Sequence, residues 1–409
     1  MRSTGDGRQV GLDADIYFKQ EIDLRHEGRS LRLRVAQDLF SSFQADAGTR
    51  LLLRTLSRVE GERVLDLGCG YGPLGLALAA VGSHSDVHMV DRDALAVEYS
   101  RQNAALNGLG GVEAYGSLGF DDVADPGFDL VVCNIPGKAG APVIEHLLLG
   151  AERHVASGGL VAIVVVDALA AAVEGTLNLA PDVEVVLKEE GARHVVFHYR
   201  FLSSSPDMLD SGWHGLEVYQ RGEGSVKVRG HDYLVDTAYG LPEFDTMAFT
   251  TGLLAATLEG KHEESVSRAL VVNPGQGHVP VALLKLFQPD EVVLAGRDLL
   301  ELRYSRKNLV DSGLPEERIS VAHQVGVLID DDQPIDLIAV RLGGGDAPEV
   351  LEALIGDAAS QVRSGGRVVV AGGSTAIARI TKLLARDKRL RVEGRRRKKG
   401  SAVLMMRAP

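Results

Sequence analysis

Two glycine-rich turns, 207 positions apart, decide the fold of this chain. They are Arg63-Val-Leu-Asp-Leu-Gly-Cys-Gly70 and Leu270-Val-Val-Asn-Pro-Gly-Gln-Gly277. In both, a short apolar run typical of a buried strand leads into glycines and then into a helical stretch. Glycine lets the backbone adopt a positive φ and approach a ligand closely. Each turn therefore predicts a strand–turn–helix unit.

The two turns belong to a longer internal repeat, with offsets between 205 and 207 residues. Its further matching segments are Tyr99-Ser-Arg-Gln-Asn103 with Tyr304-Ser-Arg-Lys-Asn308, Phe128-Asp-Leu-Val-Val132 with Ile335-Asp-Leu-Ile-Ala339, and Ser157-Gly-Gly159 with Ser364-Gly-Gly366. Two domains could share a fold without duplication. We favour duplication, because we do not expect the Tyr-Ser-Arg-x-Asn segment to be a requirement of the fold.

Within each copy, strands alternate with helical segments, which predicts a parallel, doubly wound α/β sheet. The sequence thus predicts two tandem Rossmann-like domains. The polar stretch Ser203-Ser-Ser-Pro-Asp207 is typical of a linker. We place the first domain at residues 1–203, the linker at 204–215 and the second domain at 216–409. Ligands of such sheets bind beyond the carboxyl ends of the strands.

The composition excludes several classes of protein. Of the 409 residues, 45% are hydrophobic, and the net charge is −12, which disfavours disorder and broad adhesion to nucleic acid. The longest apolar run, 158–173, is short for a membrane span, and no apolar signal segment is seen at the N-terminus. Cys69 and Cys133 form no CxxC pair, so neither disulfides nor zinc are expected. We expect a cytoplasmic protein with no metal and no membrane partner.

The first turn carries acidic residues suited to a nucleoside ligand. Asp66 precedes the glycines, and Asp91 ends the next predicted strand, where a carboxylate can accept hydrogen bonds from ribose hydroxyls. The helix that follows the glycines offers free N–H groups to an anionic part of the ligand. Alternatively, Asp91 caps the helix from Ala94, a role that Asp93 fills equally well.

These motifs resemble those of a known family. Val64-Leu-Asp-Leu-Gly-Cys-Gly-Tyr-Gly72 resembles motif I of the class I S-adenosylmethionine-dependent methyltransferases, and Cys133-Asn-Ile-Pro-Gly137 resembles their motif IV. With Phe40-Ser-Ser-Phe-Gln-Ala-Asp-Ala-Gly-Thr49, the chain is similar to the methyltransferase "small" family over residues 40–199. The resemblance implies S-adenosylmethionine as cofactor. It implies these cofactor-binding residues: Asp66, Gly68, Gly70, Tyr71, Gly72, Asp91, Arg92, Ser117 and Asn134.

Motif IV of the family is Asn-Pro-Pro followed by an aromatic residue. The Asn oxygen and the next carbonyl accept hydrogen bonds from an exocyclic base amine, and the aromatic ring stacks on the base. The resemblance therefore implies catalytic roles for Asn134, the Ile135 carbonyl and Pro136. Ile135 replaces the first proline and Gly137 the aromatic residue. Alternatively, Asn134 is a turn residue at the end of a strand, and Lys138 is a solvated charge.

Another aromatic residue could stack on the base. The candidates are Phe40, Phe43, Tyr71 and Phe120, of which we assign Phe40 to substrate binding. No general base is evident, because His84, His88, His146 and His154 lack the pattern of a triad or a metal site. Positioning of an activated methyl donor can supply much of the rate enhancement.

The second copy lacks the residues of the site. Aligned at an offset of 207, Asp66 becomes Asn273 and Asn134 becomes Arg341, Asp91 becomes Gly296, and the turn loses its third glycine. We therefore predict a degenerate domain that neither binds the cofactor nor catalyses. Its role is either substrate recognition or structural support of the active copy.

A basic run lies near the C-terminus of this second copy. It consists of Arg395, Arg396, Arg397, Lys398 and Lys399, which could bind RNA phosphates or form a solvated hairpin turn.

The leading hypothesis is methyl transfer to an exocyclic base amine of RNA, guanine N2 in ribosomal RNA, by a monomer with a pseudo-dimeric pair of domains. The family's tandem members are ribosomal RNA guanine-N2 methyltransferases, which generally keep the active copy second; this chain has the reverse order. The first alternative is a methyltransferase of a small molecule or a protein side chain. The second is a non-catalytic RNA-binding protein, which the retention of Asp66, Asp91 and Asn134 disfavours.

Overall fold

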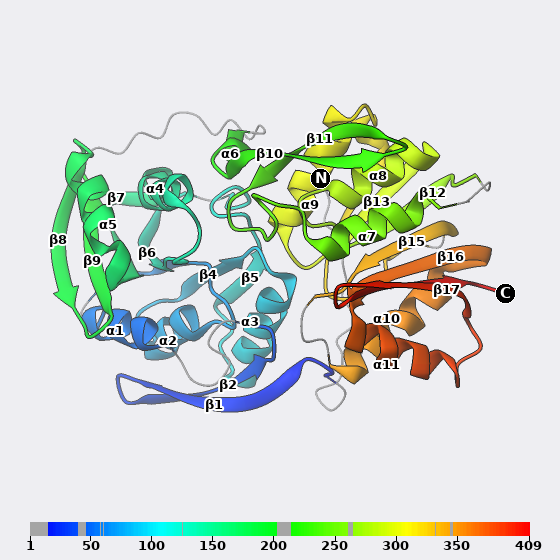
Figure 1. The fold of residues 1–409 in the computed structure, drawn as a ribbon. Coiled ribbons are helices and arrows are strands. Elements are labelled where there is room, and N and C mark those ends of the chain that lie inside the picture. Colours follow the sequence, from blue (N-terminus) through cyan, green and yellow to red (C-terminus); the bar gives the residue numbers. More distant parts are fainter. Residues whose placement is uncertain are drawn as a thin grey trace.

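The computed structural model describes residues 15–39, 46–57, 59, 61–124, 126–202, 214–260, 265–331, 333–343 and 347–409. These residues form two seven-stranded sheets, each flanked by helices, and two separate two-stranded hairpins (Figure 1). This arrangement confirms the predicted α/β class and the two tandem Rossmann-like domains. Most of the predicted linker, residues 204–213, lies outside the described residues, so the domain boundaries stay a prediction.

The first sheet has the strand order β5-β4-β3-β6-β7-β9-β8, with β3 to β7 parallel and β9 antiparallel to both of its neighbours, β7 and β8. The chain order reverses between β4 and β6, on either side of β3, which is where ligands bind in such sheets. The strands are β3 (Arg63–Leu67), β4 (Asp86–Asp91), β5 (Val112–Gly116), β6 (Phe128–Asn134), β7 (Val155–Val166), β8 (Val183–Glu190) and β9 (His194–Phe201). The helices are α1 (Ala47–Thr55), α2 (Pro73–Val81), α3 (Ala94–Leu106), α4 (Ala141–Leu149), the short η2 (Gly150–Arg153) and α5 (Asp167–Leu179).

The second sheet repeats this order as β14-β13-β12-β15-β16-β18-β17. Its strands are β12 (Arg268–Val272), β13 (Glu291–Gly296), β14 (Ile319–His323), β15 (Ile335–Arg341), β16 (Val362–Gly373), β17 (Arg391–Lys398) and β18 (Ser401–Arg407). The helices are α7 (Phe249–Leu258), α8 (His278–Phe287), α9 (Leu299–Asp311), η3 (Glu316–Arg318), α10 (Pro348–Gln361) and α11 (Ser374–Leu384).

A hairpin precedes each sheet and packs beside its helices. The first is β1 (Phe18–His26) with β2 (Arg29–Ala36), and the second is β10 (Gln220–Val228) with β11 (His231–Ala238), which follows the short α6 (His214–Glu217). In Figure 1, α1 to α3 lie below the first sheet, whereas their counterparts α7 to α9 lie above the second. The corresponding helices of the two domains thus lie on opposite sides of their sheets in this view.

The Tyr-Ser-Arg-x-Asn segments hold each glycine turn in place. Ser100 Oγ donates to the carbonyl of Gly70 at 2.9 Å, and Asn103 Nδ2 donates to the carbonyls of Tyr71 and Arg34 at 2.9 and 3.0 Å. Asn103 Oδ1 accepts from Arg34 N at 2.7 Å, which ties the turn to β2. The expectation that this segment is not required by the fold is therefore wrong.

The second domain repeats this network. Ser305 Oγ donates to Gly275 O at 3.2 Å, and Asn308 bonds to both backbone groups of Asp236 in β11 and to the carbonyl of Gln276. All four Ser and Asn side chains are buried. A common architecture therefore explains the repeated segment without any appeal to shared activity.

The structure also corrects the predicted alignment of the two glycine turns. Strands β3 and β12 correspond at an offset of 205, not 207, because two extra residues enter only between α9 and β14. The counterparts of Gly68, Gly70 and Gly72 are thus Asn273, Gly275 and Gly277. All six have positive φ, with 75°, 59° and 90° in the first domain and 53°, 63° and 99° in the second. The third glycine is retained, and Asn273 is one of the few non-glycine residue types that tolerate this region.

The counterpart of Asp66 is Val271. Asp66 is fully buried and its Oδ2 accepts the N–H of Gly75 at 2.8 Å, whereas its Oδ1 has no partner among the described residues. At the position of Gly75 the second domain has Pro280, which has no N–H to donate. The carboxylate acceptor and the N–H donor are thus both absent from the second domain, so no N–H group is left there without its acceptor.

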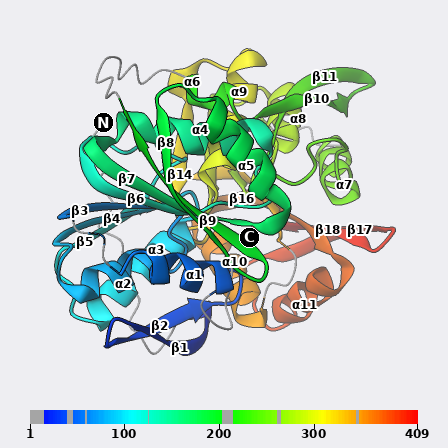
Figure 2. The ribbon, with the colours of Figure 1, turned by 90° about the vertical axis from the view of Figure 1, so that its left-hand side faces the viewer.

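The domains meet through a reciprocal contact at the N-termini of α3 and α9. Asp93 and Asp298, which cap these helices, form an antiparallel β-bridge. Arg297 bonds to both carboxylate oxygens of Asp93 at 3.0 and 2.6 Å, and Arg92 pairs with Asp298 at 3.2 Å. Arg303 adds ion pairs to Asp121 and Asp122 across the same interface. Figure 1 shows the two domains side by side, and Figure 2 views the molecule from the first domain, which lies in front of the second. Each half supplies equivalent residues, as in an isologous dimer interface.

No helix among the described residues is long and apolar enough to span a membrane.

Replacing Asn103 with Ala should destabilise the first domain by about 3–5 kcal/mol. The change leaves three buried backbone groups of Arg34 and Tyr71 without partners, and each such group costs about 1–3 kcal/mol. Urea unfolding followed by circular dichroism measures the loss. Asn107 is the matched control, because it bonds to both backbone groups of Arg32 one turn later but at an exposed position. Water can replace these bonds, so N107A should cost less than about 1 kcal/mol; an equal loss would contradict the assignment.

The stability conferred by Asp66 should depend on pH. Burial raises the pKa of Asp66 to about 7, against 3.8 when unfolded, so ionisation disfavours the fold. The stabilising contribution of Asp66 to the free energy of unfolding is therefore full below pH 4 and is lost as the pH rises through 7. D66N keeps an oxygen for Gly75 N but does not titrate. The free energy of unfolding of the wild type minus that of D66N should therefore fall by roughly 2–4 kcal/mol between pH 4 and 8. A difference independent of pH, measured by urea unfolding at several pH values, would refute it.

Candidate functional site

The glycine loop of the first domain (residues 68–72) has an open side. Gly68 N and Cys69 N donate to Val90 O at 2.8 and 2.9 Å, which holds the loop against β4. A Cβ atom built at Gly68 or Gly70 would meet no atom of the described part of the chain within 4 Å. At Gly72, by contrast, a Cβ would lie 2.8 Å from Leu76, because this glycine starts helix α2. The loop can therefore admit a ligand against its backbone at Gly68 and Gly70.

Asp91 lies beside this open side, at the carboxyl end of β4. Its Oδ2 accepts from Gly70 N and its Oδ1 from Asp93 N, both at 2.9 Å. Burial raises the pKa of Asp91, and these two N–H donors oppose the shift. Each carboxylate oxygen keeps a further lone pair for a hydroxyl donor. Asp93, not Asp91, caps α3 by accepting from Leu95 N, so the capping alternative for Asp91 is wrong.

Asn134 ends β6, and its amide is oriented by α1. Its Nδ2 donates to Asp46 Oδ2 and to Thr49 Oγ1, both at 3.2 Å. Asp46 is also the N-cap of α1, where it accepts from Gly48 N at 2.9 Å, and His194 Nε2 lies 3.8 Å from it. Because both amide hydrogens are engaged on one side, the amide oxygen is left to accept a hydrogen bond from a ligand.

The loop after Asn134 combines a buried anchor with an exposed tip. Ile135 is buried, with its N–H donating to Val164 O at 2.9 Å, whereas Pro136, Gly137 and Lys138 are exposed. A Cβ at Gly140, which caps α4, would lie 2.6 Å from the ring of Tyr239 in the second domain. The second domain therefore touches the segment that would hold the methyl acceptor.

Other side chains predicted to bind the cofactor are engaged elsewhere. The Tyr71 ring is 2% exposed and packs in the core, as does the carboxylate of Asp66. Arg92 donates to Gly240 O at 2.8 Å and pairs with Asp298, so it serves the domain interface. Ser117 Oγ donates to Gly119 O and accepts from Asp122 N within its own loop. These four side chains thus have structural partners of their own, and their predicted contact with the cofactor stays a prediction.

Of the four candidate base-stacking residues, the structure describes two, Tyr71 and Phe120. Phe40 and Phe43 lie outside the described residues. Phe120 is buried and stacks on His154, with ring centres 4.8 Å apart, and Tyr71 is buried as well. Burial lowers the pKa of His154 to about 4, which keeps this histidine neutral in the core.

The basic run Arg395–Lys399 lies mostly in the edge strand β17, and only its last residue lies in a hairpin turn. Residues 395–398 belong to β17, and the turn lies at Lys399 and Gly400, with φ of 49° and 82°. All five basic residues are exposed. Arg396 Nη1 donates to Ala256 O at the end of α7, at 2.8 Å. This strand offers a row of cations on the second domain.

In the second domain, Arg341 fills the space over the glycine loop. Its Nη2 would lie 3.0 Å from a Cβ at Gly275, and its Nε donates to Asn273 O at 3.1 Å. Nη2 also pairs with Glu301 at 2.8 Å, and Nη1 with Glu243 at 3.5 Å. Glu301 Oε2 accepts from Gly275 N, which replaces the bond that Asp91 makes in the first domain. The second-domain residue that corresponds to Asn134 is thus an arginine, and its side chain fills the space beside the glycine loop.

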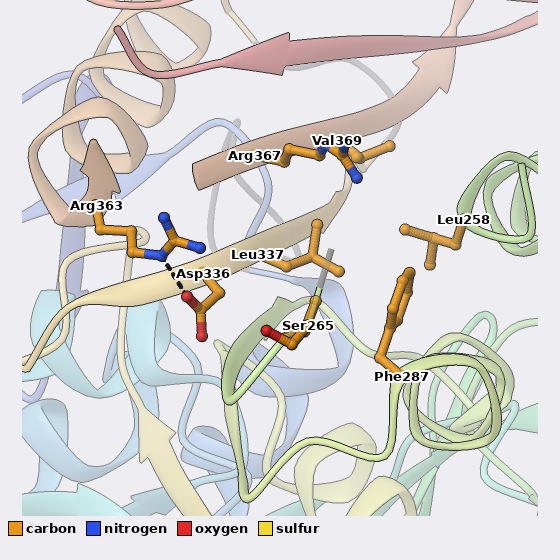
Figure 3. Close-up of a pocket in the computed structure, with 9 residues that line it drawn as sticks. Leu258, Ser265, Phe287, Asp336, Leu337, Arg363, Arg367 and Val369 are labelled. Carbon is orange, nitrogen blue, oxygen red and sulfur yellow. Dashed lines mark hydrogen bonds and ion pairs between the residues drawn. The ribbon is translucent and has the colours of Figure 1, made fainter. Parts of the chain in front are cut away.

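A small hollow in the second domain lies near the amino ends of β12 and β15, at the end of the strands opposite to the glycine loop (Figure 3). Its polar residues are paired, because Asp336 accepts from the N–H groups of Ser267 and Arg268 and pairs with Arg363. None of its lining residues belongs to the second glycine loop. Among the described residues, no cluster of three metal-ligating side chains is found.

Sequence reasoning missed Asp46 and Thr49 as the partners of Asn134. Both lie in the segment 40–49 that carried the resemblance, and the Asp-x-x-Thr spacing that starts a helix was a usable signal. It also missed that the Arg341 side chain fills the space beside the second glycine loop. The sequence shows that asparagine is replaced by arginine, but it does not show whether the arginine side chain enters that space.

Known proteins resemble both the first domain and the whole chain. Residues 30–192 match the model of the methyltransferase small domain. YbxB of Bacillus subtilis, a protein named as uncharacterized, is 33% identical over 177 residues, which are 42% of this chain and 88% of YbxB. Ribosomal RNA small subunit methyltransferase C of Vibrio cholerae is 33% identical over 159 residues, 38% of this chain and 46% of that protein. The match thus spans less than half of the latter.

A solved structure shares the two-domain fold. It is the T. thermophilus 16S rRNA N2 G1207 methyltransferase RsmC in complex with AdoMet and guanosine, with a TM-score of 0.65 and 19% identity, over 95% of this chain and 98% of that one. With the glycine loop, Asp91 and Asn134 in place, and with nearly all of YbxB matched, the chain belongs to the methyltransferase small family of S-adenosylmethionine-dependent enzymes.

Proposed function

We propose that this protein transfers a methyl group from S-adenosylmethionine to an exocyclic amine of an RNA base, guanine N2 in ribosomal RNA. The observation that carries the proposal is the orientation of Asn134 beside an open glycine loop. Its amide hydrogens are held by Asp46 and Thr49, so its oxygen can accept from an amine. Relatives named as ribosomal RNA methyltransferases support the acceptor class.

The cofactor fits the open side of the glycine loop. Gly68 and Gly70 leave room for it, and Asp91 can accept hydrogen bonds from its ribose hydroxyls. When bound, S-adenosylmethionine supplies a methyl group that is activated by the positive charge on its sulfur. Asn134 Oδ1 and the Ile135 carbonyl accept the hydrogens of the amine and turn its lone pair toward that methyl. The amine loses its proton after the attack, so positioning carries most of the catalysis.

We assign the two domains different roles. Residues 1–203 bind the cofactor and catalyse, and residues 216–409 bind no cofactor, because Arg341 and its carboxylate partners occupy the equivalent space. The exposed cations of β17, Arg395 to Lys399, contact RNA phosphates. The reciprocal contact between the domains lets a single chain act as a monomer with a pseudo-dimeric pair of domains.

N134A should lower kcat by about 100-fold or more and change the Kd for S-adenosylmethionine by less than about twofold, since Asn134 positions the acceptor. The assay follows labelled methyl transfer to ribosomal RNA from cells that lack the protein, with digestion to nucleosides to detect N2-methylguanosine. K138A, an exposed neighbour in the same loop, is the control and should keep full activity. If N134A loses turnover and cofactor affinity to the same extent, Asn134 binds the cofactor and not the acceptor. If no nucleoside carries the label, RNA is not the methyl acceptor.

The full chain should bind one equivalent of S-adenosylmethionine in isothermal titration calorimetry. D91A should weaken binding by about 10²- to 10⁴-fold, because two hydrogen bonds to a charged carboxylate are lost. The matched control in the second domain is E301A, which removes the carboxylate that replaces Asp91 there, and it should leave the stoichiometry and affinity unchanged. A stoichiometry of two, or a loss of affinity in E301A, would show that the second domain binds the cofactor.

A further inference from the structure

The second domain exposes two aromatic rings that lie against cations. Phe244 and Phe249 are 40% and 38% exposed. The guanidinium of Arg221 lies 5.6 Å from the centre of the Phe244 ring, and the ammonium groups of Lys398 and Lys399 lie 5.8 and 5.7 Å from that of Phe249. Each ring is thus partly open to solvent and lies beside at least one cation.

These residues form a continuous surface, which we call the aromatic–basic strip. It comprises Arg221, Phe244, Phe249, Arg396, Lys398 and Lys399. In both Figure 1 and Figure 2, the β10–β11 hairpin, α7 and the β17–β18 hairpin follow one another along the second domain. Helix α7 contacts both hairpins, and Thr250 Oγ1 lies 2.7 Å from Ser401 Oγ. The two rings are therefore carried by one connected surface.

The strip is anchored by the side chains that occupy the former cofactor site. Glu243, which pairs with Arg341, also accepts from Ala248 N and from Thr251 Oγ1, both at 2.9 Å. These bonds close the loop that carries Phe244 and fix the first turn of α7, where Phe249 lies. The position of both rings thus depends on Glu243, whose side chain is only 11% exposed.

One end of the strip reaches the loop that would hold the methyl acceptor. Arg221 Nη1 donates to Tyr239 Oη at 3.0 Å, and the Tyr239 ring packs against Gly140, six residues after Asn134. Tyr239 N donates to Tyr219 O at 2.7 Å, which fixes its backbone. Arg221, at one end of the strip, is thus linked through Tyr239 to the segment that follows Asn134.

We propose that the aromatic–basic strip binds an unpaired stretch of the RNA next to the acceptor base, an inference that rests on the proposed function. Phe244 and Phe249 stack on bases, while Arg396, Lys398 and Lys399 contact phosphates. An unpaired strand fits better than a duplex, since the base faces of a duplex are covered by their neighbours. The net charge of −12 makes this local set of cations the complement of a polyanion on an otherwise acidic protein.

The test measures binding of the full-length protein to a fluorescein-labelled oligouridylate of about 12 nucleotides by fluorescence anisotropy. F244L and F249L keep the apolar bulk but remove the ring, and each should weaken binding roughly 5- to 100-fold. F18L is the matched control, because Phe18 is also 38% exposed and lies 4.6 Å from the Arg34 guanidinium, but on the first domain. F18L should bind as the wild type does.

Charge removal gives an independent measurement. The double variant K398Q/K399Q should reduce the slope of log affinity against log salt by about 1–2, as expected for two lost phosphate contacts. Unchanged affinity in F244L and F249L, or an equal loss in F18L, would overturn the proposal, as would tighter binding of a duplex of the same length. Loss of binding in the two strip variants supports the strip even if no methyl transfer to RNA is found, so the two proposals can fail separately.

Discussion

The structure depends on one constraint, a loop of alternating positive-φ residues that must be held rigid between a strand and a helix. An isolated loop of this kind would be mobile, because glycine has the largest conformational freedom to lose. In each domain a buried Ser and a buried Asn of the second helix after the loop, α3 or α9, supply the missing bonds, and the Asn also binds the hairpin that precedes the sheet. The hairpin, the loop and this helix are thereby joined by one amide, which explains why the Tyr-Ser-Arg-x-Asn segment is kept in both halves.

The same scaffold contains two different sites. In the first domain the space beside the loop is open, and polar groups that could meet a ligand are aimed by neighbours, as Asp46 and Thr49 aim Asn134. In the second domain a cation and two carboxylates fill that space. A buried arginine without partners would be costly, and Glu301 and Glu243 remove that cost. The change from Asn134 to Arg341 thus required compensating acids, and one of them also fixes the start of α7.

Much of this could be predicted from the sequence. The alternation of apolar runs and helical segments predicted the two sheets, and the glycines with Asp91 and Asn134 predicted the family. The alignment of the second glycine turn was wrong by two residues, because glycines were matched by letter, whereas the structure conserves a positive φ that Asn273 also adopts. The roles of Arg92, Ser117 and Tyr71 could not be predicted, because they depend on contacts with the second domain, with a local loop and with the core, which motif spacing does not encode.

The interface gives the second domain a structural role in the first. Arg92 and Asp93 directly follow Asp91, and both bind the second domain through Asp298 and Arg297. The strand end that carries Asp91 is therefore held by the second domain as well as by its own sheet. On the other side, Tyr239 packs on Gly140 in the segment that follows Asn134. The second domain thus contacts the chain next to both Asp91 and Asn134. These contacts involve residues outside the second glycine loop, so they persist although Arg341 fills the space beside that loop.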